Sequence, residues 1–85
     1  MKTLEEARKA WNRKPVLVSY IDRHLGAVID IGEGFDSTAE NPLYSVYRFF
    51  QIGDSWHVSA DKDSVPLKEL LEHLAYQLGD IQAAP

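Results

Sequence analysis

Cysteine is missing from this sequence of 85 residues. Its absence excludes disulfide bonds, thiolate metal ligands and cysteine nucleophiles. Long apolar runs are missing too, so no segment has the uninterrupted hydrophobic length that a membrane-spanning helix needs. The first six residues contain one basic residue and no apolar stretch, which is not the pattern of a secretory signal. We therefore expect a cytosolic (cytoplasmic) protein of a bacterium or a phage, with no membrane partner.

The composition is that of a small soluble globular domain. Hydrophobic residues make up 45% of the chain and charged residues 26%, which excludes a disordered chain. We expect one domain over residues 1–79 and a flexible tail over residues 80–85. A domain of this size buries only about 60–65% of its unfolded surface, and here no disulfide compensates. Self-association is therefore an expectation before any motif is considered.

Charge is unevenly distributed along the chain. Residues 1–14 hold five basic and two acidic residues, a net charge of +3, and the remainder holds four basic and eleven acidic residues, a net charge of −7. Arg8, Lys9, Arg13 and Lys14 suggest contact with nucleic acid, but no interleaved aromatic residues accompany them. A solvated helix face is the simpler interpretation, so we disfavour nucleic acid as a partner. The total of −4 is also small for a protein that mimics DNA.

The N-terminal segment predicts a short amphipathic helix. Thr3 and Glu6 are spaced as a capping box, in which each side chain accepts a hydrogen bond from the backbone amide of the other residue. Apolar residues at helical spacing then predict a helix over residues 4–12, which Pro15 ends. We expect Trp11 to fasten this helix to a sheet.

Four strand-like segments follow, and a second helix closes the chain. β-Branched and aromatic residues predict strands over residues 16–21, 27–31, 43–52 and 55–60. The loop over residues 32–42 is long for so small a domain, which is typical of a functional or a mobile segment. The last helix carries an apolar stripe that ends before Gly79: Leu67, Leu70, Leu71, Leu74 and Leu78. The sequence thus predicts an α+β fold, a four-stranded antiparallel β-meander flanked by an N-terminal and a C-terminal α-helix (α-β-β-β-β-α).

The third strand is apolar on both faces. The two-residue loop Gly53-Asp54 fits a type II′ hairpin, which pairs Ile52 with Ser55, Gln51 with Trp56, Phe49 with Val58 and Tyr47 with Ala60. One face of the hairpin then carries apolar residues on which the leucine-rich helix should pack: Leu43, Tyr47, Phe49, Trp56, Val58 and Ala60. The opposite face is also apolar, whereas a two-layer protein should be polar there. A slip by one residue would exchange the faces and still leave an apolar stripe uncovered.

We expect that second face to be an interface with protein. The predicted contacts are its residues and one aromatic residue of the long loop: Tyr44, Val46, Arg48, Phe50, Ile52, His57 and Phe35. Three candidates remain for what covers this face: the first helix, a second copy of the chain, or a different protein. The first helix offers only Leu4, Ala7 and Trp11, which favours association, with a homodimer as the leading hypothesis.

No set of residues predicts a catalytic or a metal site. No two of the histidines His24, His57 and His73 are closer than sixteen residues apart, and the carboxylates around the long loop lack the spacing of a calcium loop. Ser59, His57 and Asp61 can be combined into a triad on paper, but no nucleophile-elbow motif or glycine-rich oxyanion loop accompanies them. We therefore predict no catalytic residue, no metal ligand and no cofactor.

The leading hypothesis is a small acidic non-enzymatic protein that acts by protein–protein interaction, as an inhibitor, an adaptor or an accessory factor. The alternative is a small-ligand or metal-ion binding protein, or a minor enzyme, that uses His57 and the acidic loop 30–40. Stoichiometric zinc or calcium in the purified protein would favour the alternative.

Overall fold

Four antiparallel strands form a single sheet in the computed structural model, which describes residues 3–11 and 15–83 and the side chains as far as residue 76. The elements are α1 (Leu4–Trp11), β1 (Val16–Asp22), β2 (Ala27–Glu33), β3 (Tyr44–Ile52), β4 (Ser55–Val65) and α2 (Leu67–Ala83). The strands are ordered β1-β2-β3-β4, so β1 and β4 form the two edges of the sheet. The predicted α+β meander with a helix at each end is confirmed.

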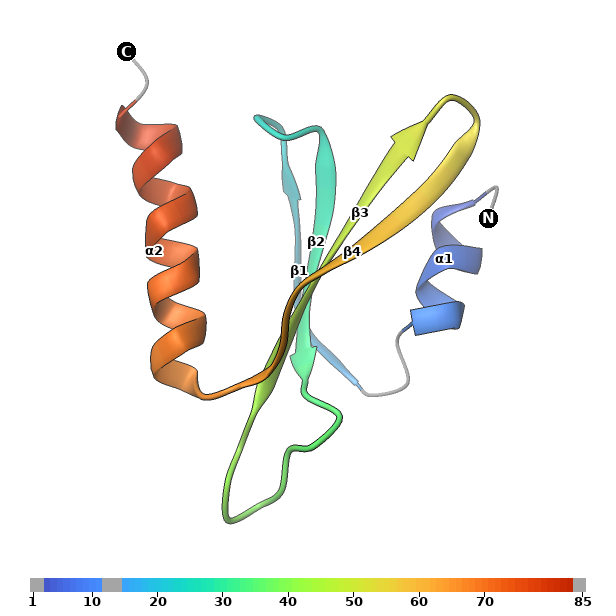
Figure 1. Cartoon of the computed structure of the whole chain (residues 1–85). Coiled ribbons are helices and arrows are strands. Elements are labelled where there is room, and N and C mark those ends of the chain that lie inside the picture. The colour runs from blue at the N-terminus through green and yellow to red at the C-terminus, as the bar shows by residue number, and fades with distance from the viewer. Residues whose placement is uncertain (1–2, 12–14, 84–85) are drawn as a thin grey trace.

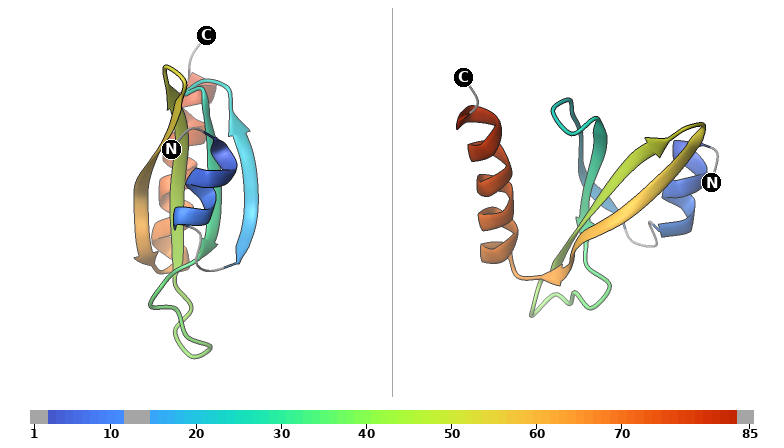
Figure 2. Two further views of the ribbon diagram at one scale, coloured as in Figure 1. Left: turned by 90° about the vertical axis from the view of Figure 1, so that its right-hand side faces the viewer. Right: turned by 45° about the horizontal axis from the view of Figure 1, so that its top comes forward.

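The two helices lie on opposite faces of the sheet, which gives three layers (Figure 1). In the left view of Figure 2, α1 lies in front of the strands and α2 behind them. The molecule measures 41 × 36 × 15 Å. Its narrow dimension is close to the width of four strands, about 14 Å for three spacings. The sheet is therefore narrow relative to its helices, and both of its long edges lie near the outside of the molecule.

Helix α1 begins at the predicted cap. The backbone N–H of Glu6 donates to Thr3 Oγ1 at 3.1 Å, which confirms the Thr3 half of the capping box. Ala7 is fully buried against the sheet, and the Trp11 ring lies 6.2 Å from that of Tyr47 on β3. The predicted contact between Trp11 and the sheet is confirmed, although nearly half of the side chain stays exposed. Residue 12, where the helix was expected to end, lies outside the described residues.

The hairpin of β3 and β4 has the predicted register. Ile52 pairs with Ser55, Gln51 with Trp56, Phe49 with Val58 and Tyr47 with Ala60. Gly53 has a φ of 62°, the positive value that the first position of a type II′ turn requires. On the other side of β3, Phe50 pairs with Ala27 and Val46 with Ile31. Phe49 and Phe50 therefore point to opposite faces of the sheet.

Helix α2 covers the face that the sequence left open. We expected it on the side of Tyr47 and Phe49, but Leu70 packs instead among Ala27, Ile29, Ile31 and Val46. The reason lies in β2, whose one face carries Ala27, Ile29 and Ile31 while its other face carries Asp30. The prediction considered the hairpin of β3 and β4 alone, and β2 decides which face receives the longer apolar helix.

Strand β4 and helix α2 both run further than predicted. β4 continues through residues 61–65, where Ser64 has a φ of 52° and the register with β3 shifts. The buried Ser45 hydroxyl accepts the Ser64 N–H at 3.0 Å and holds this irregular stretch. α2 passes through Gly79 to Ala83, because a glycine inside a helix costs only about 1 kcal/mol relative to alanine. Residues 80–83 of the expected tail are therefore helical, and residues 84–85 lie outside the described residues.

The loop over residues 34–43 is closed by hydrogen bonds. Gly34 N–H donates to the Leu43 carbonyl at 2.8 Å, and Leu43 N–H donates to Ser37 Oγ at 2.9 Å. Asp36 N–H donates to Ser64 Oγ at 3.1 Å, which ties the loop to β4. A Cβ on Gly34 would lie 2.9 Å from the Ser64 Cα, so only glycine fits this close approach.

Candidate interaction surface

The seven residues predicted as contacts do not form one exposed patch. Val46 is fully buried under α2, and Tyr44 and Phe50 pack partly buried against the same core. Val46 therefore has no exposed surface to offer to a partner. Arg48 is half-buried, Ile52 and His57 are exposed towards the β3–β4 turn, and Phe35 is exposed in the loop at the other end of β3.

Arg48, Phe50, His57 and Asp61 form a cluster on the α2 face of the hairpin. The rings of Phe50 and His57 are stacked, with centroids 6.0 Å apart, and the Arg48 guanidinium lies 5.9 Å from the Phe50 centroid. Arg48 Nη2 lies 3.3 Å from Asp61 Oδ1, which also accepts the Ser59 hydroxyl at 3.2 Å. Ser59 thus bonds to the aspartate, and His57 stacks on a ring, which is not the serine–histidine–aspartate order that catalysis needs.

A shallow cleft opens beside this cluster. It has a volume of about 330 Å³ and is lined by Leu25, Gly26, Ala27, Arg48, Phe50 and Gln51. Arg48 Nε is buried without a hydrogen-bond partner, but the guanidinium is already paired with Asp61. On the same face, burial raises the pKa of the Tyr20 hydroxyl, and the negative charges of Asp22 and Asp61 raise it further. Tyr20 is therefore a neutral hydroxyl at physiological pH.

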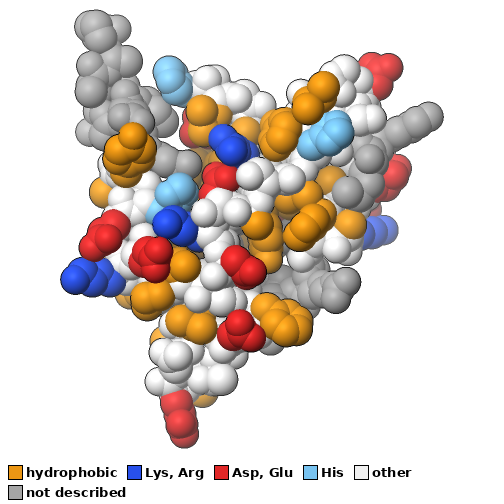
Figure 3. All heavy atoms as spheres, viewed as in Figure 1, with side chains coloured by type: hydrophobic (Ala, Val, Ile, Leu, Met, Phe, Trp, Pro, Cys, Tyr) orange, Lys and Arg blue, Asp and Glu red, His pale blue; other side chains and the backbone are white. Residues whose placement is uncertain are grey.

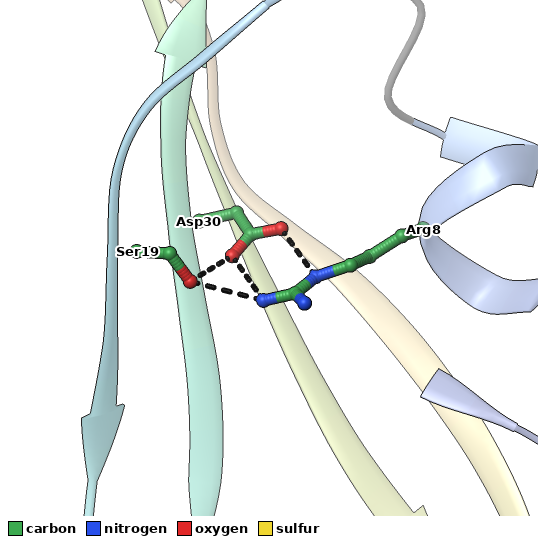
Figure 4. A network of polar contacts seen from close by, with 3 residues as sticks. All are labelled: Arg8, Ser19 and Asp30. Atoms are coloured by element: carbon green, nitrogen blue, oxygen red, sulfur yellow. Dashed lines mark hydrogen bonds and ion pairs between the residues drawn. The ribbon is translucent and has the colours of Figure 1, made fainter. Parts of the chain in front are cut away.

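The opposite face holds a polar network between α1 and the sheet (Figure 4). Arg8 donates from Nε to Asp30 Oδ2 at 2.9 Å and from Nη2 to Asp30 Oδ1 at 3.0 Å. Ser19 on β1 donates to Asp30 Oδ1 at 2.6 Å and accepts from Arg8 Nη2 at 2.9 Å. Asp30 is almost wholly buried, so the network neutralises a carboxylate that the sheet could not otherwise bury. Arg8 therefore holds α1 on the sheet.

The other charged and metal-ligating residues of the sequence are dispersed. Lys9 pairs with Glu5 on the surface of α1 at 3.6 Å, and Arg13 and Lys14 lie outside the described residues. His24 lies in the turn after β1 and His73 on α2. Within residues 3–11 and 15–83, no three histidine or acidic side chains come close enough together to hold a metal ion.

Strand β1, which lies at an edge of the sheet, exposes an unusual number of apolar side chains. The contacts predicted from the sequence did not include this strand. Four of its apolar side chains are exposed, and we call them the apolar margin: Val16 (41%), Leu17 (60%), Val18 (52%) and Ile21 (68%). No charged residue interrupts the strand before Asp22. On the α1 face, a hollow of about 320 Å³ lined by Arg8, Val16, Ser19 and Asp30 opens beside the margin. The sequence does contain one indication of this surface: β1 is the first strand of a predicted meander, and the first strand of a meander lies at a sheet edge.

Part of the leucine stripe of helix α2 also stays exposed. Glu69 pairs with Lys62 of β4 at 3.3 Å, so that side of the helix faces β4. Residues two positions apart on a helix point about 160° from one another. Leu67 and Leu71 therefore point away from Lys62, and both are about half exposed. We call Leu67 and Leu71 the leucine flank.

The β4 edge differs from the β1 edge. It carries Asp61, Lys62 and Asp63, and its pairing with β3 is interrupted by register shifts. Such charges and irregularities prevent an edge strand from pairing with another chain. Figure 3, viewed from the side on which β4 lies forward, shows acidic and basic side chains among the hydrophobic ones. The second half of the β4 edge is thus protected by charge, whereas the β1 edge has no charged residue before Asp22.

Comparisons with protein-family models, with curated proteins and with solved structures found no match to this chain. In the part of the chain that the structure describes, neither helix is long and apolar enough to cross a membrane.

Proposed function

We propose that this protein is non-enzymatic and acts by binding protein through the apolar margin of β1 and the leucine flank of α2. As an inhibitor, adaptor or accessory factor, it needs a recognition surface rather than a reactive group. The observation that carries the proposal is the run of exposed, uncharged side chains on an unpaired edge strand. An open edge recognises a partner strand through backbone hydrogen bonds, and its side chains supply apolar contact.

The surface proposed from the structure replaces most of the one proposed from the sequence. Tyr44, Val46 and Phe50 belong to the core beneath α2, which explains their apolar character without a partner. Ile52 and His57 remain exposed, but Ile52 lies at the β3–β4 turn and His57 stacks on Phe50 beside the Arg48–Asp61 ion pair. The apolar margin is larger and carries no charge, so it is the better protein-binding surface.

The test compares two charged variants in capture experiments with the full chain as bait. Ile21→Lys places a charge on the apolar margin, and Ile52→Lys places the same charge on an equally exposed isoleucine outside it. We expect a protein that wild-type chain captures in stoichiometric amount to be captured equally by Ile52→Lys, and at least tenfold less by Ile21→Lys. Equal capture by all three proteins would contradict the proposed surface.

A further inference from the structure

The β1 edge is suited to one partner in particular, and the inference rests on the proposed function. We propose that a second copy of this chain pairs with β1, strand against strand and antiparallel, across a two-fold axis. The two four-stranded sheets then form one continuous eight-stranded sheet. The apolar margin of each copy extends the margin of the other on both faces.

The exposed area of the single chain fits this arrangement. The chain exposes 5835 Å², whereas a compact monomer of 9.6 kDa exposes about 5,100 Å². The excess of roughly 700 Å² is close to the area of about 800 Å² that each partner contributes to a standard interface. The radius of gyration of 13.4 Å likewise exceeds the value of about 12 Å for a compact chain of this length. A single chain thus exposes more surface than a compact monomer of its mass, by about the area that one partner contributes to a standard interface.

The distribution of charge favours a second copy. β1 carries no charge from Val16 to Ile21, and only its last residue, Asp22, is acidic. Antiparallel pairing about the strand centre places Asp22 near the start of the other strand, not opposite its own copy. Asp22 is buried and accepts the backbone N–H groups of His24 and Leu25, so it is already satisfied. Identical strands therefore meet without opposing like charges.

The two edges differ in a way that favours pairing at β1. In its second half β4 carries Asp61, Lys62 and Asp63 and two register shifts, which disfavour pairing there, whereas β1 carries no charge from Val16 to Ile21. Two copies that pair through β1 about a two-fold axis use the same edge in both chains, so this contact closes on a single partner. Leu17 faces no residue of its own, because the β1–β2 register skips it between Val16 and Val18. We therefore expect continuous pairing over residues 18–22.

The test is the mass in solution of three full-length proteins at about 50 µM, measured by light scattering after gel filtration. We expect twice the chain mass of 9.6 kDa for the wild type and for Ile52→Lys, and the mass of one chain for Ile21→Lys. The two isoleucines are matched in exposure, 68% and 62%. Circular dichroism and thermal unfolding check that each variant is folded.

Two outcomes overturn the inference, namely a monomeric wild type and an Ile21→Lys variant that stays dimeric. If the wild type is monomeric but captures a different protein that Ile21→Lys no longer captures, the partner of β1 is not a second copy. The proposed function then still holds. A dimer that persists in Ile21→Lys, with capture also unchanged, removes both.

Cross-linking tests the strand pairing itself. A two-fold axis perpendicular to the sheet places one residue of β1 opposite its own copy, because paired residues share a face. The chain has no cysteine, so single-cysteine variants at positions 17–21 can be compared with Ile52→Cys. We expect oxidation to give a covalent dimer at one or two of the five positions and none with Ile52→Cys. A dimer that none of the five positions cross-links overturns the strand pairing.

Discussion

At the scale of single residues, the most consequential contact joins Arg8 and Asp30. They are 22 residues apart in sequence, and one side chain is basic and part-exposed while the other is acidic and buried. The chain thereby buries a carboxylate in its sheet and uses it to position a helix of only eight residues. A buried carboxylate deprived of its cation is costly, because its charge is then no longer compensated.

We expect Arg8→Ala to lower the free energy of unfolding by about 2–3 kcal/mol, because it removes charge-assisted hydrogen bonds to a buried group. Lys9→Ala is the matched control on the same helix. Its ion pair with Glu5 is exposed on both sides, so we expect less than about 0.5 kcal/mol. Urea denaturation followed by circular dichroism measures both. Equal losses for the two variants would show that the network contributes no more than a surface pair.

The chemistry of single residues also explains which features of the fold could be predicted from the sequence. The loop Gly53-Asp54 allows few geometries, so the hairpin register followed from it, and Thr3 marked the start of α1. The face that α2 covers did not follow, because both faces of β3 are apolar. That choice depends on Asp30 being neutralised by Arg8, and a contact between distant residues leaves no periodic signal.

At the scale of elements, β1 and α2 share one property: each is only partly covered within the chain. β1 has the composition of a buried strand and lies at an edge. α2 packs through Leu70 and Leu74, while the leucine flank stays half exposed. Composition and periodicity predicted the type and place of both elements, although α2 continues past the predicted stop at Gly79 to Ala83. They could not predict exposure, because a strand of the same composition fits an edge or the centre of a sheet.

The contributions of the buried and the half-exposed leucines of α2 to stability can be measured separately. We expect Leu70→Ala to lower the free energy of unfolding by about 2–4 kcal/mol, because it leaves a cavity in the core beneath α2. Leu71→Ala, one residue further along, should lower it by less than about 1 kcal/mol, since its side chain is half exposed. Chemical denaturation of both variants checks this. A larger loss for Leu71→Ala would mean that α2 is rotated from the position described.

At the scale of the whole molecule, the chain is a thin slab with charged residues along half of its β4 edge and an apolar β1 edge. Its smallest dimension, 15 Å, lies across the strands, which is the direction in which pairing at β1 would widen it. The absence of disulfides and the small size leave little stability to spare in a single chain. Pairing of two copies would bury apolar surface that one chain cannot bury, so folding stability and recognition would depend on the same strand.

Hydrogen exchange along β1 tests most directly whether the open edge is an interface. Wild-type protein is compared at about 1 µM and at about 200 µM, with β4 as the internal reference. We predict that backbone amides of residues 18–22 that point away from β2 exchange at least tenfold more slowly at the higher concentration, while β4 is unchanged. Fast exchange of these amides, equal at both concentrations, would contradict the account.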